Sequence, residues 1–187
     1  MTPSFAHDRP APNRSRCFIA LGPDAPTRRR LKGLAKSLPA PARLHPADLH
    51  LTIAFLGALT AECEAGLHDA LRPLARRLPD LAFTSLELWP SPARPRVAVA
   101  GYALPDGLRQ LVAETQAILT GMALPVESRP FRPHVTLARF KHGQPAPSPP
   151  PQPAGVPPAR FETLGLYCGA PAGSAVRYAA LFRFDLT

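Results

Sequence analysis

Two tetrapeptides with the same pattern, His-apolar-Thr-apolar, constrain this chain more than any other feature of its sequence. They stand at residues 50–53 and 134–137, 84 positions apart (134 − 50 = 84), and both lie in strand-like segments. Successive side chains of a strand point to opposite faces, so the histidine and threonine of each copy share one face. The opposite face of the first copy is predicted to hold Leu51, Ile53 and Phe55. Each copy therefore presents an imidazole beside a hydroxyl on one face of a strand, and the opposite face of that strand is apolar.

Paired imidazole and hydroxyl groups suit chemistry at a phosphorus atom. Histidine titrates near neutrality, so His50 and His134 are candidates to protonate one oxygen while deprotonating another. The hydroxyls of Thr52 and Thr136 can donate to the non-bridging oxygens of a phosphate. One proton-transfer group contributes about 10²–10⁴-fold to a rate. That modest factor favours a strained cyclic phosphate over an unstrained diester as the substrate.

The order of the remaining segments predicts one α+β domain. The first half of the chain reads as a strand, a helix, a motif strand and a helix. The second half reads as strands, a helix, a motif strand and further strands, so the two halves have a similar order. We expect a bilobal fold in which two pseudo-symmetric lobes, each with an antiparallel sheet and helices, enclose a central cleft lined by both motifs. Residues 1–15 are expected to form a flexible extension, 16–187 the single bilobal domain, and the proline-rich stretch 144–158 a long surface loop.

Local signals place the other elements. Helices are expected from Thr27 to Leu38, after Thr60 and after Asp106, because threonine and aspartate cap helices well, and Pro73 should shorten the second helix. Strands are expected over residues 17–21, 83–89, 97–102, 161–168 and 176–186.

Composition sets the broad class but not the function. The net charge of +9 suits a polyanionic ligand, yet 19 of the 22 basic residues are arginine, as a genomic composition bias would also give. No apolar run is long enough for a membrane span and the first fifteen residues lack the core of a signal peptide, so we expect a cytoplasmic protein without a membrane partner. The three cysteines, an odd number without a Cys-x-x-Cys pair, indicate reduced thiols and not a zinc site.

The residues around both motifs resemble the two-histidine phosphoesterase superfamily. Within it they are similar to the RNA 2',3'-cyclic phosphodiesterase branch, also called the bacterial 2'-5' RNA ligase-like (LigT-like) family. The resemblance covers most of the chain from Arg16 onward. It rests on residues 16–21, 48–57, 95–97, 129–139 and 164–167.

This resemblance implies hydrolysis of RNA 2',3'-cyclic phosphate ends, opened at the 3' side to leave a 2'-phosphate. Carried over by position, His50 is the proton donor to the leaving 3' oxygen, His134 is the proton acceptor that activates water, and Thr52 and Thr136 bind the phosphate. The spacing alone does not distinguish acid from base. The resemblance implies no metal and no cofactor, an RNA or nucleotide partner with a cyclic phosphate end, a monomer, and reversible 2'-5' RNA ligation as a second reaction.

Two alternatives stay open at the level of sequence. Asp48 and His50 are expected to share a strand face, and with His134 they could form a two-His, one-carboxylate metal site for a metal-dependent phosphodiesterase. A non-catalytic RNA- or nucleotide-binding module is the other alternative. The chain also departs from the family pattern at two places near the first motif. Arg43 stands where an aromatic residue is common, and residues 47–48 read Ala-Asp in place of Glu-Asn.

Overall fold

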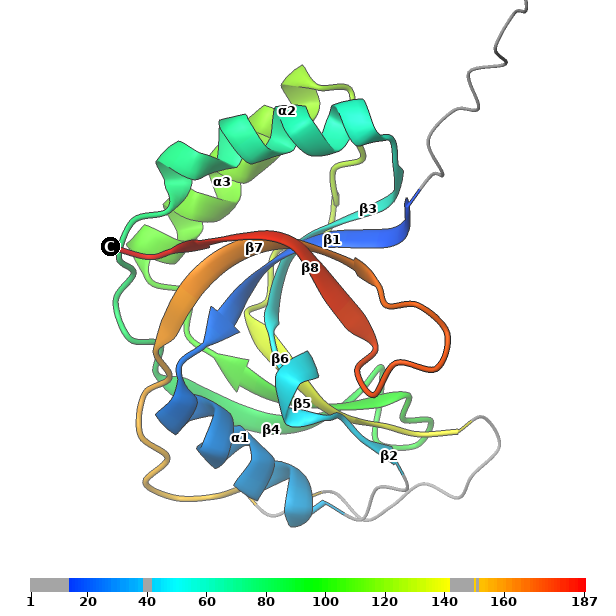
Figure 1. Cartoon of the computed structure of the whole chain (residues 1–187). Coiled ribbons are helices and arrows are strands. Elements are labelled where there is room, and N and C mark those ends of the chain that lie inside the picture. The colour runs from blue at the N-terminus through cyan, green and yellow to red at the C-terminus, as the bar shows by residue number, and fades with distance from the viewer. Residues whose placement is uncertain (1–13, 39–41, 142–149, 151) are drawn as a thin grey trace, which may run out of the picture.

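The computed structural model describes residues 14–38, 42–141, 150 and 152–187. Within them the chain has the predicted α+β class (Figure 1). The strands are β1 Arg14–Pro23, β2 Ala42–Arg43, β3 Leu51–Leu59, β4 Phe83–Trp89, β5 Val97–Tyr102, β6 His134–Arg139, β7 Phe161–Gly169 and β8 Tyr178–Asp185. The helices are α1 Ala25–Lys36, α2 Ala61–Leu71 and α3 Asp106–Gly121, with short 3₁₀ turns η1 Pro46–Asp48 and η2 Arg72–Leu74.

The strands form one antiparallel sheet in the order β4-β5-β6-β3-β1-β7-β8, and β2 also pairs with β6. The two motif strands, β3 and β6, are central neighbours, and the pair Leu51–Val135 joins them. This narrow junction divides the sheet into two halves, β8-β7-β1-β3 and β6-β5-β4. The halves correspond to the two predicted lobes, and each motif strand is the inner strand of one half.

The helices cross between the halves. Helix α1 follows β1 in the chain but packs on β6, whereas α3 comes directly before the segment leading to β6 but packs on β3. Figure 1 shows α2 and α3 at one end of the molecule and α1 at the other. Each half-sheet therefore receives a helix from the other half of the chain, which couples the two halves around the motif strands.

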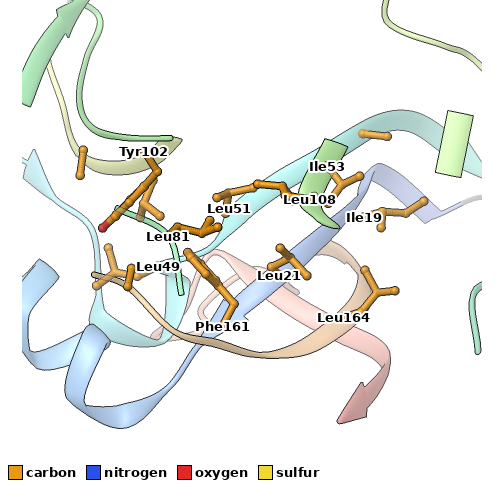
Figure 2. Close-up of a cluster of buried hydrophobic side chains, with 14 of the residues drawn as sticks. Ile19, Leu21, Leu49, Leu51, Ile53, Leu81, Tyr102, Leu108, Phe161 and Leu164 are labelled. Carbon is orange, nitrogen blue, oxygen red and sulfur yellow. The ribbon is translucent and has the colours of Figure 1, made fainter. Parts of the chain in front are cut away.

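The apolar backs of both motifs lie in the core. Leu51, Val135 and Leu137 are fully buried, and Figure 2 shows Leu51 in one cluster with side chains such as Ile19, Leu21 and Leu108. Burying one such leucine contributes about 1.5–3 kcal/mol. The packing of its apolar face in the core thus fixes each motif strand, and it also fixes the positions of the histidine and threonine on the opposite face.

Each motif strand has a β-bulge at the residue after its threonine. The β1 partners of β3 skip Ile53, and the β5 partners of β6 skip Leu137. A bulge inserts an extra residue, so the alternation of faces is reversed beyond it. The prediction that Phe55 faces the core is therefore wrong: its side chain is 65% exposed. Arg139 is likewise turned to the face of the motif residues.

Two helix starts differ from prediction by a few residues. Asp24, not Thr27, is the N-cap of α1, and its carboxylate accepts from the Thr27 backbone N–H. Pro105 is the N-cap of α3, and Asp106 is its first helical residue. Thr60 caps α2 as predicted, with its hydroxyl accepting from the backbone of Cys63. In α1 the stronger cap lies one turn earlier, so the helix begins there.

Part of the predicted extension and loop lies outside the described residues. Of the extension 1–15, β1 already begins at Arg14, and residues 1–13 are not described. Of the loop 144–158, residues 144–149 and 151 are not described. The side chain of Gln152 bonds to both the backbone N–H and the carbonyl of Leu86, so this part of the loop follows the edge strand β4. No helix in the described part of the chain is long and apolar enough to span a membrane.

Candidate active site

The two motifs meet at the junction of the half-sheets. His50 directly precedes β3, Thr52 lies within it, and His134 and Thr136 lie in β6. Because Leu51 and Val135 pair in antiparallel register, His50 is nearer Thr136 and Thr52 is nearer His134. All four side chains are half-buried. The structure thus brings the four predicted site residues together.

Both imidazoles are oriented by a backbone carbonyl two residues earlier. His50 Nδ1 lies 2.6 Å from the Asp48 carbonyl oxygen, and His134 Nδ1 lies 2.8 Å from that of Arg132. A carbonyl oxygen only accepts, so each Nδ1 carries the hydrogen. Each Nε2 is then available to accept a proton, or to donate one when the ring is charged.

Aromatic side chains surround His50. Phe18 stacks on the imidazole with ring centroids 4.6 Å apart, and the Tyr167 ring lies nearly parallel to both, 5.5 Å from Phe18 and 6.4 Å from the imidazole. Tyr178 meets the imidazole edge-on at 5.4 Å. Phe55, turned outward by the bulge, lies 6.2 Å from Phe18 at the exposed rim. These rings remove water from the imidazole and leave it a largely apolar environment.

That environment changes the proton affinity of His50. Burial lowers its pKa from 6.5 to about 4, and the charges of Arg139 and His134 act in the same direction. The carbonyl and carboxylate of Asp48 oppose this shift. Burial also lowers the pKa of His134, against the opposing effect of the Arg132 carbonyl. In the unliganded protein both rings are therefore mainly neutral at pH 7.

Asp48 does not face the cleft as the metal-site alternative requires. It ends η1 and not a strand, so the expectation that it shares a strand face with His50 is wrong. Its carboxylate is buried and accepts from the backbone N–H groups of Arg177, at 2.9 and 3.1 Å, and Tyr178, at 3.3 Å. It therefore fixes the start of β8, where Tyr178 contacts His50. Among the described residues, no group of three or more His, Cys, Asp or Glu side chains could hold a metal ion.

A polar cluster lies beside His134. The Trp89 ring is tilted against the imidazole at 4.5 Å between centroids, and the Arg132 guanidinium lies 4.4 Å above the Trp89 ring. Glu87 accepts from Ser85, from the Trp89 indole N–H and from Arg132. The predicted alternation of β4 is correct, and it places Ser85, Glu87 and Trp89 on the cleft face. The His134 side of the site is thus more polar than the His50 side.

Sequence reasoning did not assign a role to several residues of this site. They are Phe18, Glu87, Trp89, Arg132, Arg139, Tyr167 and Tyr178. Arg139 bonds to the Tyr178 hydroxyl at 3.4 Å, and its Nε is buried without a hydrogen-bond partner in the described chain. Its position in the sequence could have indicated it, because Arg139 lies five residues after His134 just as Phe55 lies five residues after His50. Tyr178 had no local signal because tertiary packing alone brings it there.

The departure at Arg43 has a structural explanation. Its Nε donates to the Ala35 carbonyl at 2.7 Å, and a terminal nitrogen donates to those of Leu38 at 2.9 Å and Lys36 at 3.3 Å. The carbonyls of Ala35 and Lys36 belong to the last turn of α1, where most carbonyls lack an intrahelical partner, and Leu38 follows the helix end. Arg43 therefore caps α1 and ties it to β2, away from the motif histidines.

The chain also resembles known proteins in sequence. The chain matches the family model described as LigT like Phosphoesterase over residues 21–99 and 102–164. The RNA 2',3'-cyclic phosphodiesterase of Escherichia coli K12 is 36% identical over 150 residues, which cover 75% of this chain and 77% of that protein. The protein of the same name from Aeropyrum pernix is 34% identical over 95 residues, 50% of this chain and 54% of that protein. The second match thus spans about half the length of that relative.

Solved structures extend the likeness to nearly the whole chain. Escherichia coli LigT complexed with 3'-AMP has a TM-score of 0.71 at 28% identity, covering 93% of this chain and 99% of that one. A protein of Thermus thermophilus has a TM-score of 0.73 at 26% identity, covering 91% and 97%. The fold described above is therefore similar to theirs over most of the chain.

Proposed function

This chain belongs to the LigT-like phosphoesterase family, and on that premise we propose that it hydrolyses RNA ends that carry a 2',3'-cyclic phosphate. The P–O3' bond breaks and a 2'-phosphate remains. The names of the relatives and the 3'-AMP bound to Escherichia coli LigT support this substrate class. The observation that carries the proposal is the meeting of two His-Thr pairs on either side of the Leu51–Val135 pair.

In the proposed reaction the two histidines act on opposite sides of the phosphorus. His134 Nε2 takes a proton from the attacking water as the new P–O bond forms, and charged His50 donates its Nε2 proton to the leaving O3'. Afterwards His134 holds the extra proton and His50 is neutral, so exchange with solvent resets the pair. The carbonyl bonds at both Nδ1 atoms support these roles, because they leave each Nε2 for the substrate.

The lowered pKa of His50 means that the substrate itself must help to charge the acid. Burial disfavours the imidazolium in the unliganded protein. A phosphate anion bound between the two rings opposes that effect, because an opposite charge within a few ångströms stabilises the charged form. We therefore assign the competent protonation state to the complex and not to the free protein.

Thr52 and Thr136 complete the proposed site by donating their hydroxyls to the non-bridging oxygens. No step requires a metal, and we propose a metal-independent reaction. The same proton transfers with an RNA 5'-hydroxyl in place of water would join two RNAs by a 2'-5' bond. All four residues come from one chain, which supports a monomer as the working unit.

The decisive test offers an oligonucleotide with a 2',3'-cyclic phosphate to the protein in excess EDTA and identifies the product. We expect a 2'-phosphate from the unmodified protein, and a rate lower by about 10²-fold or more for His50→Ala and His134→Ala. Tight binding without turnover would favour the non-catalytic module. Turnover that EDTA removes and a divalent ion restores would favour metal-dependent hydrolysis.

A further inference from the structure

A cavity of about 160 Å³ lies on the His134 side of the site and has no part in the proton transfers proposed above. Trp89, Arg132 and Phe131 are among the residues that line it. Gly101, which also lines it, pairs with His134 across the β5–β6 ladder. A ligand held by the motif residues can therefore extend into this cavity.

Gly101 keeps one wall of the cavity free of side-chain atoms. A Cβ at this position would lie 2.7 Å from the Ser85 hydroxyl, closer than such contacts allow. That hydroxyl donates to Glu87 Oε1 at 2.6 Å. A larger residue at position 101 would thus displace the Ser85 hydroxyl, which orients the Glu87 carboxylate. The position of this carboxylate therefore depends on the glycine.

The Arg132 guanidinium is held as a flat platform at the mouth of the cavity. Its central carbon lies over the Trp89 ring, 4.4 Å from the ring centroid, and a terminal nitrogen donates to Glu87 Oε2 at 3.0 Å. The Arg132 side chain is nevertheless 63% exposed. A guanidinium that is fixed on one face and open to solvent offers its other face for stacking.

The chemistry of this cavity fits a nucleobase better than a second phosphate. Aromatic and apolar groups such as Phe131 line it, and the Glu87 carboxylate offsets the charge of Arg132 and would repel an anion. A nucleobase has flat faces that stack on arginine and aromatic rings, and its edge has N–H groups that a carboxylate can accept. In the described chain Glu87 Oε1 accepts from Ser85 alone, which leaves it able to accept another hydrogen bond.

We propose that this cavity binds the base of the nucleotide whose phosphate lies between the motifs, with Arg132 on Trp89 as the stacking platform and Glu87 as the acceptor at the base edge. This deepens the proposed function and rests on it only in taking the ligand to be a nucleotide. It predicts that the protein recognises a base-bearing end, and not the cyclic phosphate alone.

Trp89 makes the proposal directly measurable, because it is the single tryptophan of the chain. Its fluorescence is followed while 2'-AMP, ribose 5-phosphate or inorganic phosphate is added to the full-length protein. We expect saturable quenching by 2'-AMP that is deeper than with either base-free ligand at saturation. Equal quenching by all three ligands would overturn the proposal, because the signal would then come from phosphate binding at His134.

Two variants and a matched control separate base binding from phosphate binding. Arg132→Ala and Glu87→Gln should each weaken 2'-AMP binding, the first by about tenfold, the scale of one lost stacking contact. Binding of inorganic phosphate should change less than twofold. Arg129→Ala removes a nearby exposed arginine that pairs with Glu127 and should change neither. If Arg132→Ala weakens 2'-AMP and phosphate equally, the guanidinium is a phosphate ligand and the base site is refuted.

The experiments can support or overturn the base-binding cavity and the proposed hydrolysis separately. Base-dependent quenching in a protein that does not open the cyclic phosphate would support the base site and end the proposed function. Hydrolysis with no difference in KM between 2',3'-cyclic AMP and a base-free cyclic phosphate substrate, and no base-dependent quenching, would leave the function and overturn the base site.

Discussion

Acidification should destabilise this protein through His50 at a pH where most carboxylates still carry their charge. The imidazole is buried against Phe18 and Tyr178, and its pKa falls from 6.5 to about 4. In the unfolded chain the ring regains its ordinary pKa. Between these two values the unfolded state binds the proton and the folded state does not, so stability is complete above pH 6.5 and is lost as the pH falls toward 4.

The size of this effect follows from the two pKa values. Each pKa unit corresponds to about 1.4 kcal/mol, so the full difference is about 3 kcal/mol. At about pH 4.5 the unfolded ring is almost fully charged and the folded ring is still mostly neutral. Linkage then gives a loss of about 2–3 kcal/mol relative to neutral pH from this one residue. That is a large share of the stability of an ordinary domain, about 5–15 kcal/mol.

Urea unfolding at pH 7.5 and pH 4.5 measures the effect, with His50→Asn as the comparison. The variant cannot be charged at this position, so its stability should fall by about 2–3 kcal/mol less than that of the unmodified protein over the same interval. An NMR titration of the ring that disappears in His50→Asn gives the folded pKa directly. Equal pH dependence in both proteins, or a midpoint near 6.5, would refute the reasoning that the aromatic shell keeps this ring neutral.

Three further predictions concern activity on a cyclic phosphate end. The profile of kcat/KM against pH should be bell-shaped and fall as pH rises above about 6.5, because burial lowers the pKa of both free histidines; a flat profile from about pH 5 to 9 would contradict it. Thr52→Ala and Thr136→Ala should lower kcat/KM by about 5- to 150-fold, the equivalent of one lost hydrogen bond to a charged group, while the matched Thr→Ser variants retain most of it. Asp48→Ala should destabilise the fold by about 1–3 kcal/mol in urea unfolding and should lower kcat by releasing Tyr178. Asp48→Asn should retain part of the stability and part of the kcat that Asp48→Ala loses. Unchanged stability of Asp48→Ala would refute the anchoring role.

The elements of this fold are predictable because their signals are local. The strand 83–89, the helix capped by Thr60 and both motif strands follow from alternation, capping and apolar stripes within a few residues. The exact helix starts are harder to predict, because Asp24 and Thr27 both offer a capping oxygen. Aspartate is the stronger cap, and the Thr27 hydroxyl instead accepts from the Arg160 backbone N–H. The β-bulges were missed for a related reason. A bulge depends on the register with the neighbouring strand, and the segment 50–55 reads as a regular strand on its own.

The residues of the candidate site likewise fall into a group that the sequence predicts and a group that it does not. The four motif residues could be placed from sequence because they repeat, and their apolar alternates indicate which face they occupy. The residues that give each histidine its environment could not be placed. Tyr178 and Asp48 are 130 positions apart and meet only through a backbone bond to a buried carboxylate. Asp48 also shows how a pattern misleads: the His-Asp proximity that suggested a metal site is real in sequence, but the carboxylate turns to the β8 backbone.

The pseudo-symmetry of the fold supplies two similar motifs, yet the proposed reaction needs an acid and a base, so something must make them different. The bulge after each threonine turns the fifth residue after each histidine to the cleft face, and that residue is Phe55 in one half and Arg139 in the other. Aromatic rings then surround His50, whose pKa burial lowers to about 4, whereas His134 lies beside a polar cluster in which the charge of Arg132 lowers its pKa and that of Glu87 raises it. In the free protein these environments favour charging His134 before His50, the reverse of the proposed starting state. The proposed roles therefore require the bound phosphate to invert the order, and an NMR titration with 2'-AMP should show the His50 pKa rising by more than that of His134. If His134 alone gains the proton on binding, the acid and base roles of the two histidines must be exchanged.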